Sequence, residues 1–193
     1  MASPPVTRQD TESAFLDAAE RLLVSAGHAG ITTRALAEEA GANHGLVHYY
    51  FGSMENLLAR VLERFTEQMI ERQRTMYAEP EVPFSEKWRT AMRYLDADRD
   101  YQKVWYELQA LAWNRPELRE RVSQVDAEWR AVLTEALTEP RERYGIAMPL
   151  TALVALMITF NEGIIFERLS GIETGQQALL DWIDGWVARR EDG

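Results

Sequence analysis

The stretch from Thr32 to Leu57 constrains the fold more than any other part of the chain. Thr32 carries a hydroxyl that is placed to cap a short helix. Gly41 is placed to end that helix, because glycine adopts positive φ at no steric cost. Asn43 is placed to cap a second short helix. The stretch therefore has the parts of a helix-turn-helix: a close helix crossing, a tight turn and an apolar contact that holds the second helix.

These residues resemble a known family. The stretch is similar to the DNA-binding region of the TetR family of bacterial transcriptional regulators. Two positions depart from the family pattern: His48 stands where the family usually has tyrosine, and Met54 where it usually has a lysine that contacts a phosphate. The positions that carry the resemblance are Thr32, Leu36, Ala37, Ala40, Gly41, Gly45, Tyr50, Phe51, Glu55 and Leu57.

In the rest of the chain, the spacing of apolar residues predicts further helices and no sheet. Apolar residues recur at helical spacing, and no segment alternates with the period of two that a half-buried strand shows. Pro80 and Pro83 interrupt the helical pattern and mark its clearest break. Outside the helix-turn-helix, the predicted helices span residues 8–26, 53–77, 84–95, 101–114, 116–137, 149–169 and 174–190.

The resemblance implies an all-α fold in two domains. The first, residues 1–52, is expected to be an N-terminal three-helix helix-turn-helix DNA-binding domain. The second, residues 53–193, is expected to be a C-terminal helical ligand-binding and dimerisation domain. A chain of 193 residues with 46% hydrophobic content can bury a core large enough for either one large or two small domains.

Charge argues against DNA binding at first sight. The chain has a formal net charge of −10, and residues 1–52 contain three arginines against six acids, a balance of −3. Affinity for DNA rests largely on cations that neutralise phosphates. Helix N-termini, hydroxyls and backbone amides also hold phosphates, however. We therefore expect weak non-specific binding to DNA and a marked sensitivity to salt.

The resemblance also suggests roles for residues of the helix-turn-helix. It implies that Thr32 and Tyr50 hold phosphates, while other side chains of the second helix reach toward base edges. Asparagine and histidine hydrogen-bond to bases, and leucine or tyrosine contacts the thymine methyl group. The predicted DNA-binding residues are Thr32, Thr33, Arg34, Asn43, His44, Leu46, His48, Tyr49 and Tyr50.

Six tryptophans all follow residue 84, and several share helical stripes with other apolar residues. Such stripes either pack in a core or line an apolar cavity with a few polar anchors. The resemblance favours a cavity for a small molecule, and no cofactor is expected. The predicted ligand-binding residues are Trp88, Met92, Trp105, Gln109, Trp113, Trp129, Met157, Phe160 and Asn161.

The last two predicted helices carry apolar residues on more than one face, which indicates a subunit interface. The resemblance implies a homodimer through these helices, at about residues 149–190. No apolar run reaches the roughly 18 residues of a membrane span, and the longest is Leu150 to Phe160. The N-terminus lacks the apolar core of a signal peptide. We therefore expect a cytoplasmic protein that does not bind membranes.

Other site chemistries have weak support. His44 and His48 have the spacing of half a metal site, but there is no cysteine and no third ligand nearby. The segment from Asp96 to Glu107 has acids at calcium-ligand positions, yet Tyr101 stands where the sharp turn needs glycine. No Gly-rich phosphate loop or nucleophile elbow is present. The sequence predicts neither a metal site nor catalytic residues, and so no enzyme.

The sequence thus predicts a ligand-responsive transcriptional regulator, and by resemblance a repressor. It would bind a palindromic operator as a dimer, and a small, largely apolar or aromatic effector would release it. The alternative is a dimeric small-molecule binding protein with weak or vestigial DNA binding, which the acidic N-terminal domain and Met54 favour. The sequence alone does not separate a repressor from an activator.

Overall fold

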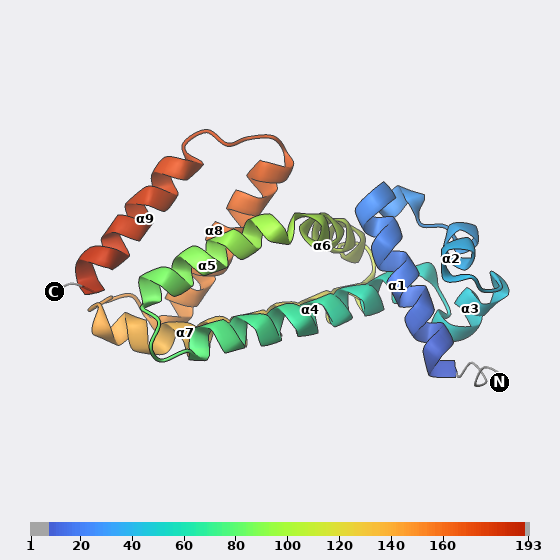
Figure 1. Cartoon of the computed structure of the whole chain (residues 1–193), viewed down its shortest axis with the longest axis horizontal. Helices are drawn as coiled ribbons and strands as arrows, with labels where there is room; N and C mark the ends of the chain where they lie inside the picture. The colour runs from blue at the N-terminus through green and yellow to red at the C-terminus, as the bar shows by residue number, and fades with distance from the viewer. Residues whose placement is uncertain (1–7, 192–193) are drawn as a thin grey trace, which may run out of the picture. The chain divides into compact units, whose positions relative to one another are not determined.

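The computed structural model describes residues 8–191, apart from the side chains of residues 28 and 100. Within that range the chain forms α-helices, one short 3-10 helix and no strand, as predicted (Figure 1). The elements in chain order are α1 (Arg8–Ala26), η1 (His28–Gly30), α2 (Thr33–Ala40), α3 (Gly45–Phe51), α4 (Met54–Ala78), α5 (Phe84–Ala97), α6 (Arg99–Ala112), α7 (Pro116–Arg143), α8 (Leu150–Leu169) and α9 (Gln176–Glu191).

Local signals set the boundaries of the helix-turn-helix. The hydroxyl of Thr32 accepts a hydrogen bond from the backbone N–H of Ala35 at 3.1 Å and so caps α2. Gly41 has a φ of 62° and ends α2, as predicted. The side-chain oxygen of Asn43 accepts a hydrogen bond from the backbone N–H of Gly45 at 2.9 Å. The N-cap residue of α3 is His44, which forms no side-chain cap, so the bond from Asn43, one residue earlier, supports the start of the helix in its place.

The predicted end of α7 was wrong. The helix continues past residue 137 to residue 143 and contains Pro140. Proline removes one helix hydrogen bond, but it does so near the end of a long helix. The carbonyl of Pro140 still accepts a hydrogen bond from the backbone N–H of Tyr144 at 2.9 Å. This bond closes the last turn of the helix, which ends at Arg143.

The chain divides into two compact units. Unit 1 comprises Met1–Thr66 and Asp100–Ser123, and unit 2 comprises Glu67–Arg99 and Gln124–Gly193. Helices α4 and α7 each contribute residues to both units. The division predicted after Gly52 does not coincide with these units, because the first part of α4 packs with the helix-turn-helix. As a statement about which residues bind DNA, that division stays a prediction.

Unit 1 encloses a core built mainly from α1, α2, α3 and the first part of α4. Phe15 of α1 is fully buried and lies against Tyr50 and Phe51 of α3, with ring centroids 6.3 Å apart in both pairs. Arg64 of α4 forms salt bridges to Asp17 at 2.8 Å and Glu20 at 2.7 Å, both on α1. The helix-turn-helix is therefore held by both apolar packing and ion pairs.

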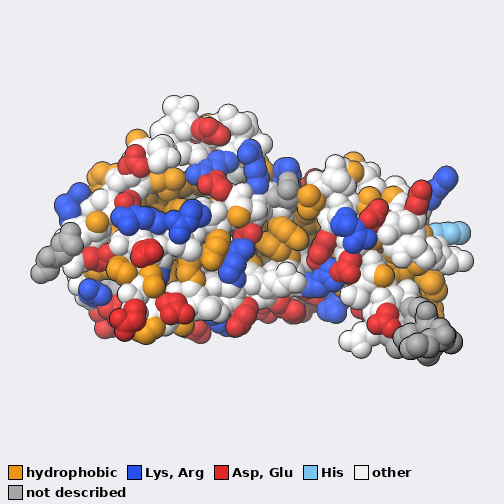
Figure 2. Space-filling model, in the orientation of Figure 1, with side chains coloured by type: hydrophobic (Ala, Val, Ile, Leu, Met, Phe, Trp, Pro, Cys, Tyr) orange, Lys and Arg blue, Asp and Glu red, His pale blue; other side chains and the backbone are white. Residues whose placement is uncertain are grey.

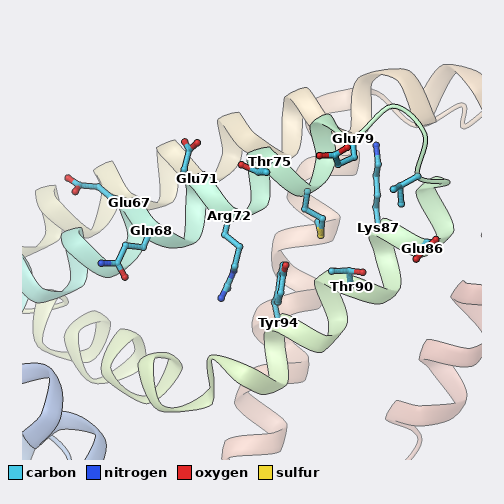
Figure 3. Close-up of a pocket in the computed structure, with 12 residues that line it drawn as sticks. Glu67, Gln68, Glu71, Arg72, Thr75, Glu79, Glu86, Lys87, Thr90 and Tyr94 are labelled. Carbon is cyan, nitrogen blue, oxygen red and sulfur yellow. The ribbon is translucent and has the colours of Figure 1, made fainter.

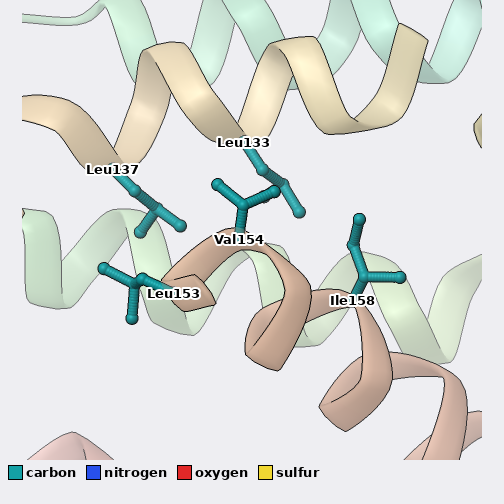
Figure 4. Close-up of a cluster of buried hydrophobic side chains, with 5 residues drawn as sticks. All are labelled: Leu133, Leu137, Leu153, Val154 and Ile158. Carbon is teal, nitrogen blue, oxygen red and sulfur yellow. The ribbon is translucent and has the colours of Figure 1, made fainter. Parts of the chain in front are cut away.

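Unit 2 has its own aliphatic cluster between α7 and α8. The side chains from the two helices interdigitate, as Figure 4 shows. Burying each such side chain contributes about 1.5–3 kcal/mol to folding. Helix α9 lies against α5, where Arg89 binds Asp184 through two hydrogen bonds of 2.7 and 3.0 Å. The members of the cluster are Leu133, Leu137, Leu153, Val154 and Ile158.

Helix α8 has two apolar faces, as predicted. One face is buried in unit 2, whereas Leu156 is 51% exposed and Phe166 is 59% exposed. By length and composition α8 is also apolar enough to cross a membrane, so the expectation that no segment reaches that length was wrong. A core helix passes the same test. The buried residues of α8 show that it packs within unit 2.

Candidate nucleic-acid interface and effector region

The second helix of the helix-turn-helix, α3, combines a buried face with an exposed one. Val47 is fully buried and Phe51 is 7% exposed, so the inner face is fixed in the core of unit 1. On the outer face Tyr49 is 68% exposed. The imidazole Nδ1 of His48 lies 3.3 Å from the carbonyl oxygen of Gly52, which restrains the ring at the surface. Helix α3 thus presents side chains to solvent from a rigid base.

The structure brings all nine predicted DNA-binding residues together in unit 1. Most are exposed, whereas Thr33, Leu46 and Tyr50 are half-buried. Thr33 is the first residue of α2, and Leu46 is the second residue of α3. They are only partly accessible because they begin helices that pack against the core. The exposed members of the set are Thr32, Arg34, Asn43, His44, His48 and Tyr49.

Arg8 is a further candidate that the sequence did not single out. Its guanidinium lies 5.8 Å from the centroid of the Tyr49 ring and 5.7 Å from that of Tyr50. The two tyrosine rings are themselves 5.2 Å apart. Arg8 begins α1, far from α3 in the sequence, so only the packing of α1 on α3 places this cation there. It adds positive charge beside the exposed tyrosines.

Several acids of the helix-turn-helix region are paired with arginines. Glu39 binds Arg21 at 2.5 Å, and Arg64 binds both Asp17 and Glu20. Arg64 lies outside residues 1–52, so the count of −3 did not include it. Figure 2 shows acidic and basic side chains intermingled over the visible face. Residues 53–66 add Arg60 and Arg64 but also Glu55 and Glu63, so the balance stays at −3 and the ion pairs only redistribute the charge.

The start of α4 is held by a capping residue and an ion pair. The hydroxyl of Ser53 accepts a hydrogen bond from the backbone N–H of Asn56 at 3.1 Å. A backbone hydrogen bond at Glu55 and the bond from Arg115 together lower the pKa of the Glu55 carboxyl. Between these residues Met54 is half-buried and brings no charge. The segment is therefore rigid but lacks a cation at this position.

This geometry agrees with the comparison to known families. Residues 15–61 match the model of the bacterial regulatory proteins of the tetR family. The comparisons support a TetR-family regulator. Members of this family are DNA-binding regulators rather than enzymes, and this chain is a TetR-type transcriptional regulator. TetR-family regulators bind DNA and small-molecule effectors and are typically dimers.

Individual transcriptional regulators are similar over most of the chain. The transcriptional regulator EthR of Mycobacterium tuberculosis is 27% identical over 167 residues, which cover 84% of this chain and 77% of EthR. FadR of Bacillus subtilis, solved in complex with stearoyl-CoA, has a TM-score of 0.69 at 17% identity, covering 91% of this chain and 96% of FadR. A putative regulator from Saccharomonospora viridis in complex with choline has a TM-score of 0.72 at 17% identity, covering 96% and 95%.

The predicted effector residues fall into two groups. Trp105, Gln109 and Trp113 belong to unit 1, and Trp113 is 71% exposed. The predicted set is therefore divided between the two units rather than gathered in one. The role of these three residues in binding a ligand stays a prediction. The members in unit 2 are Trp88, Met92, Trp129, Met157, Phe160 and Asn161.

The unit 2 group contains direct aromatic packing. Trp88 of α5 is 4% exposed, and its ring centroid lies 5.9 Å from that of Phe160 on α8. Trp129 and Met157 are partly buried and pack against the α7–α8 cluster. Asn161 is 9% exposed, and its side-chain oxygen is buried. This part of unit 2 is therefore apolar and aromatic, with one buried amide.

A groove between α4 and α5 was not predicted. It has a volume of about 810 Å³, and none of the nine predicted effector residues lines it (Figure 3). Arg72 of α4 and Tyr94 of α5 meet across the groove, with the guanidinium 4.1 Å from the ring centroid. Arg72 also binds Asp98 in a salt bridge. Only the packing of α5 on α4 forms this groove, so no local sequence pattern indicates it.

Proposed function

We propose that this TetR-family protein is a repressor that binds a palindromic operator as a dimer and is released by a small-molecule effector. The observation that carries the proposal is the exposure of Tyr49 on a helix whose opposite face is locked in the core of unit 1. A recognition helix must present side chains to base edges without moving. Helix α3 meets that requirement.

Residues around Tyr49 supply complementary chemistry for DNA. Asn43 and His44 are exposed at the start of α3 and offer groups that hydrogen-bond to bases. Tyr49 offers an apolar ring for a thymine methyl group. Thr32 and Tyr50 are assigned to phosphates. The exposed cations Arg8 and Arg34 strengthen the attraction to the DNA backbone.

The dimer is proposed to form through α8 and α9. Leu156 and Phe166 are exposed on α8, and Leu179 and Trp182 are 44% and 62% exposed on α9. Large apolar side chains gathered on two neighbouring helices are typical of a subunit interface. Gly163 is exposed on α8, and a β-carbon at this position would meet open space, so another helix can approach it closely.

The effector is proposed to bind in unit 2 and to be largely apolar or aromatic. Trp88, Phe160 and Met157 provide an apolar setting that suits such a molecule. Two recognition helices must enter successive major grooves about 34–36 Å apart. An effector that binds better to a dimer with another spacing shifts the population away from the DNA-binding state. Helix α4, which belongs to both units, is proposed to transmit the change.

The test is a selection from random double-stranded DNA. The purified protein is mixed with the pool at low salt, and the retained DNA is sequenced. We expect an enriched palindrome whose half-site spacing matches about one helical turn or a multiple of it. Loss of the bound DNA on raising the salt is also expected, because phosphate contacts release counterions.

The second candidate function is that of a dimeric small-molecule binding protein that binds DNA only weakly. Met54 favours it, because this residue brings no charge where the family usually has lysine. A folded dimer that enriches no DNA sequence in the selection supports this candidate over the repressor. An enriched palindrome rejects it.

A further inference from the structure

Two buried side-chain amides in unit 2 have an oxygen without a hydrogen-bond partner among the described residues. They are Oε1 of Gln73 on α4 and Oδ1 of Asn161 on α8. Gln73 is 5% exposed and Asn161 is 9% exposed. Buried polar atoms in folded proteins are almost always paired, because water no longer solvates them. Each of these oxygens therefore requires an explanation.

Another buried amide in unit 2 shows what a purely structural role looks like. Gln176 is 6% exposed, and its Oε1 accepts a hydrogen bond from Nε of Arg168 at 3.0 Å. Its Nε2 donates to Oε2 of Glu167 at 2.8 Å and to the carbonyl of Ile172 at 3.0 Å. Both the oxygen and the nitrogen of the Gln176 side-chain amide are thus hydrogen-bonded within unit 2. The amide of Asn161 differs because no donor from residues 8–191 reaches its oxygen.

The buried neighbours of Asn161 on α8 are aliphatic. It lies on the buried face of α8 between Ile158 and Ile164. Phe160, the residue before it, packs on the buried indole of Trp88. Gln73 is on α4, whereas the Trp88–Phe160 contact is made by α5 and α8. Within the described part of unit 2, Asn161 is therefore an unpaired acceptor whose neighbours on the buried face of α8 are aliphatic, next to an aromatic contact made by Phe160.

We infer that Asn161 is the polar anchor of the effector, and that the effector is an uncharged apolar molecule with a hydrogen-bond donor. A hydroxyl, an amide N–H or an indole N–H satisfies the free oxygen of Asn161 while the rest of the molecule contacts apolar side chains. A cationic donor is disfavoured, because a single neutral oxygen does not offset the loss of hydration of a buried charge. This inference rests on the proposed effector function of unit 2.

The first experiment needs no ligand. Asn161→Leu replaces the unpaired amide by an apolar side chain of similar size. We expect its melting temperature to rise by about 2–4 °C, because an unsatisfied buried group is removed. Gln176→Leu is the matched control, and its melting temperature is expected to fall, because it breaks three hydrogen bonds. A fall for Asn161→Leu as well overturns the inference, since it means that the fold itself needs the amide.

The second experiment uses pairs of molecules that differ in the donor. Decanol is compared with its isomer methyl nonyl ether, and indole with N-methylindole, by titration calorimetry and thermal shift on the intact protein. In at least one pair, we expect the molecule that carries the hydrogen-bond donor to bind about tenfold more tightly than the molecule that lacks it. In Asn161→Leu that difference is expected to disappear.

Two results contradict the inference. Equal binding within both pairs, including no binding at all, means that a donor does not select the ligand. A difference that persists in Asn161→Leu places the acceptor elsewhere. These measurements contain no DNA, so their failure leaves the operator selection unaffected. A failed operator selection likewise leaves the preference for donors intact.

Discussion

At the scale of single residues, neighbours on one helix have opposite environments. Tyr49 is 68% exposed, whereas Phe51, two positions further along α3, is 7% exposed. Two positions turn a helix by roughly 200°, so these side chains leave opposite faces. Phe51 packs on Phe15 and fixes the helix, and Tyr49 is free to contact another molecule. A substitution at each position therefore affects a different property.

Tyr49→Ala is expected to abolish operator binding while leaving the dimer intact. The change removes an exposed ring proposed to contact bases and takes nothing from the core, so affinity should fall by at least about thirtyfold. Fluorescence anisotropy with the selected operator measures the affinity, and sedimentation measures the dimer. Trp113→Ala, which removes an exposed ring outside α3, is the control and should bind normally. Normal binding by Tyr49→Ala would reject α3 as the recognition helix.

Glu191 is expected to make stability depend on pH. Its carboxylate accepts hydrogen bonds from the backbone N–H of Ser85 at 2.9 Å and the hydroxyl of Tyr144 at 2.8 Å. Burial alone raises the pKa of Glu191, but the hydrogen bonds from Ser85 and Tyr144 outweigh it and the pKa is lowered. A lowered pKa stabilises the folded state above the ordinary value of 4.5, and this stability is lost as pH falls through the folded value.

Glu191→Gln should therefore reduce the free energy of unfolding at pH 7 by about 1 kcal/mol, a small value because solvent screens the group. The same variant should lose less stability than the wild type between about pH 5 and about pH 3. Urea unfolding across this range tests both points. Glu173→Gln, at an exposed glutamate, is the control. Parallel pH profiles for Glu191→Gln and the wild type would contradict the expectation.

At the scale of elements, α8 and α9 each combine a packed face with an apolar exposed face. Val154 and Ile158 bury α8 in unit 2, while Leu156 is exposed on the other side. On α9, Val187 is buried and Trp182 is exposed. Exposed apolar surface of this kind costs free energy in water unless a partner covers it. A second copy of the chain is the partner proposed here.

Trp182→Glu is expected to convert the dimer into monomers. A tryptophan at the centre of an interface typically contributes at least about 2 kcal/mol, so dimer dissociation should increase about thirtyfold or more. Sedimentation velocity over a concentration series measures the change, and circular dichroism checks that the helices remain. Val24→Glu, at an exposed apolar residue of α1, is the control and should stay dimeric. An unchanged dimer in Trp182→Glu would place the interface elsewhere.

At the scale of the whole molecule, charge opposes the proposed function. The net charge of −10 repels DNA, and only the local arrangement of cations compensates for it. Salt bridges of Arg21 and Arg64 neutralise acids near the helix-turn-helix. Arg8 adds a cation beside Tyr49. Binding should therefore depend on few phosphate contacts.

Met54→Lys is expected to strengthen binding to DNA of any sequence. It supplies a cation at the position where the family usually has one, so the slope of log affinity against log salt should steepen by about 0.9. Anisotropy titrations at several salt concentrations measure that slope. Gln68→Lys, which adds the same charge at an exposed position of α4 in unit 2, is the control. Equal effects of both variants would show that net charge matters rather than position.

The sequence by itself determined the helices and the helix-turn-helix. Caps, stops and breaks such as Thr32, Gly41 and Pro80 act on residues within one or two turns, so they are readable from the order of residues. The candidate DNA-binding residues were chosen for the same reason, because nearly all of them fall within one short stretch, and their contacts with DNA stay a prediction. The end of α7 was not predictable from the sequence. The position of a proline does not show whether the packing of the whole helix lets the helix continue through it.

The tertiary structure decided what depends on contacts between distant residues. Arg64 pairs with Asp17 and Glu20, and Arg72 meets Tyr94 across a groove, only because particular helix faces pack together. The unpaired oxygen of Asn161 likewise exists because no neighbouring element in the described range offers a donor. Helical spacing predicts which residues share a face, but it does not say which face another helix covers. That choice is made by the packing of the whole chain.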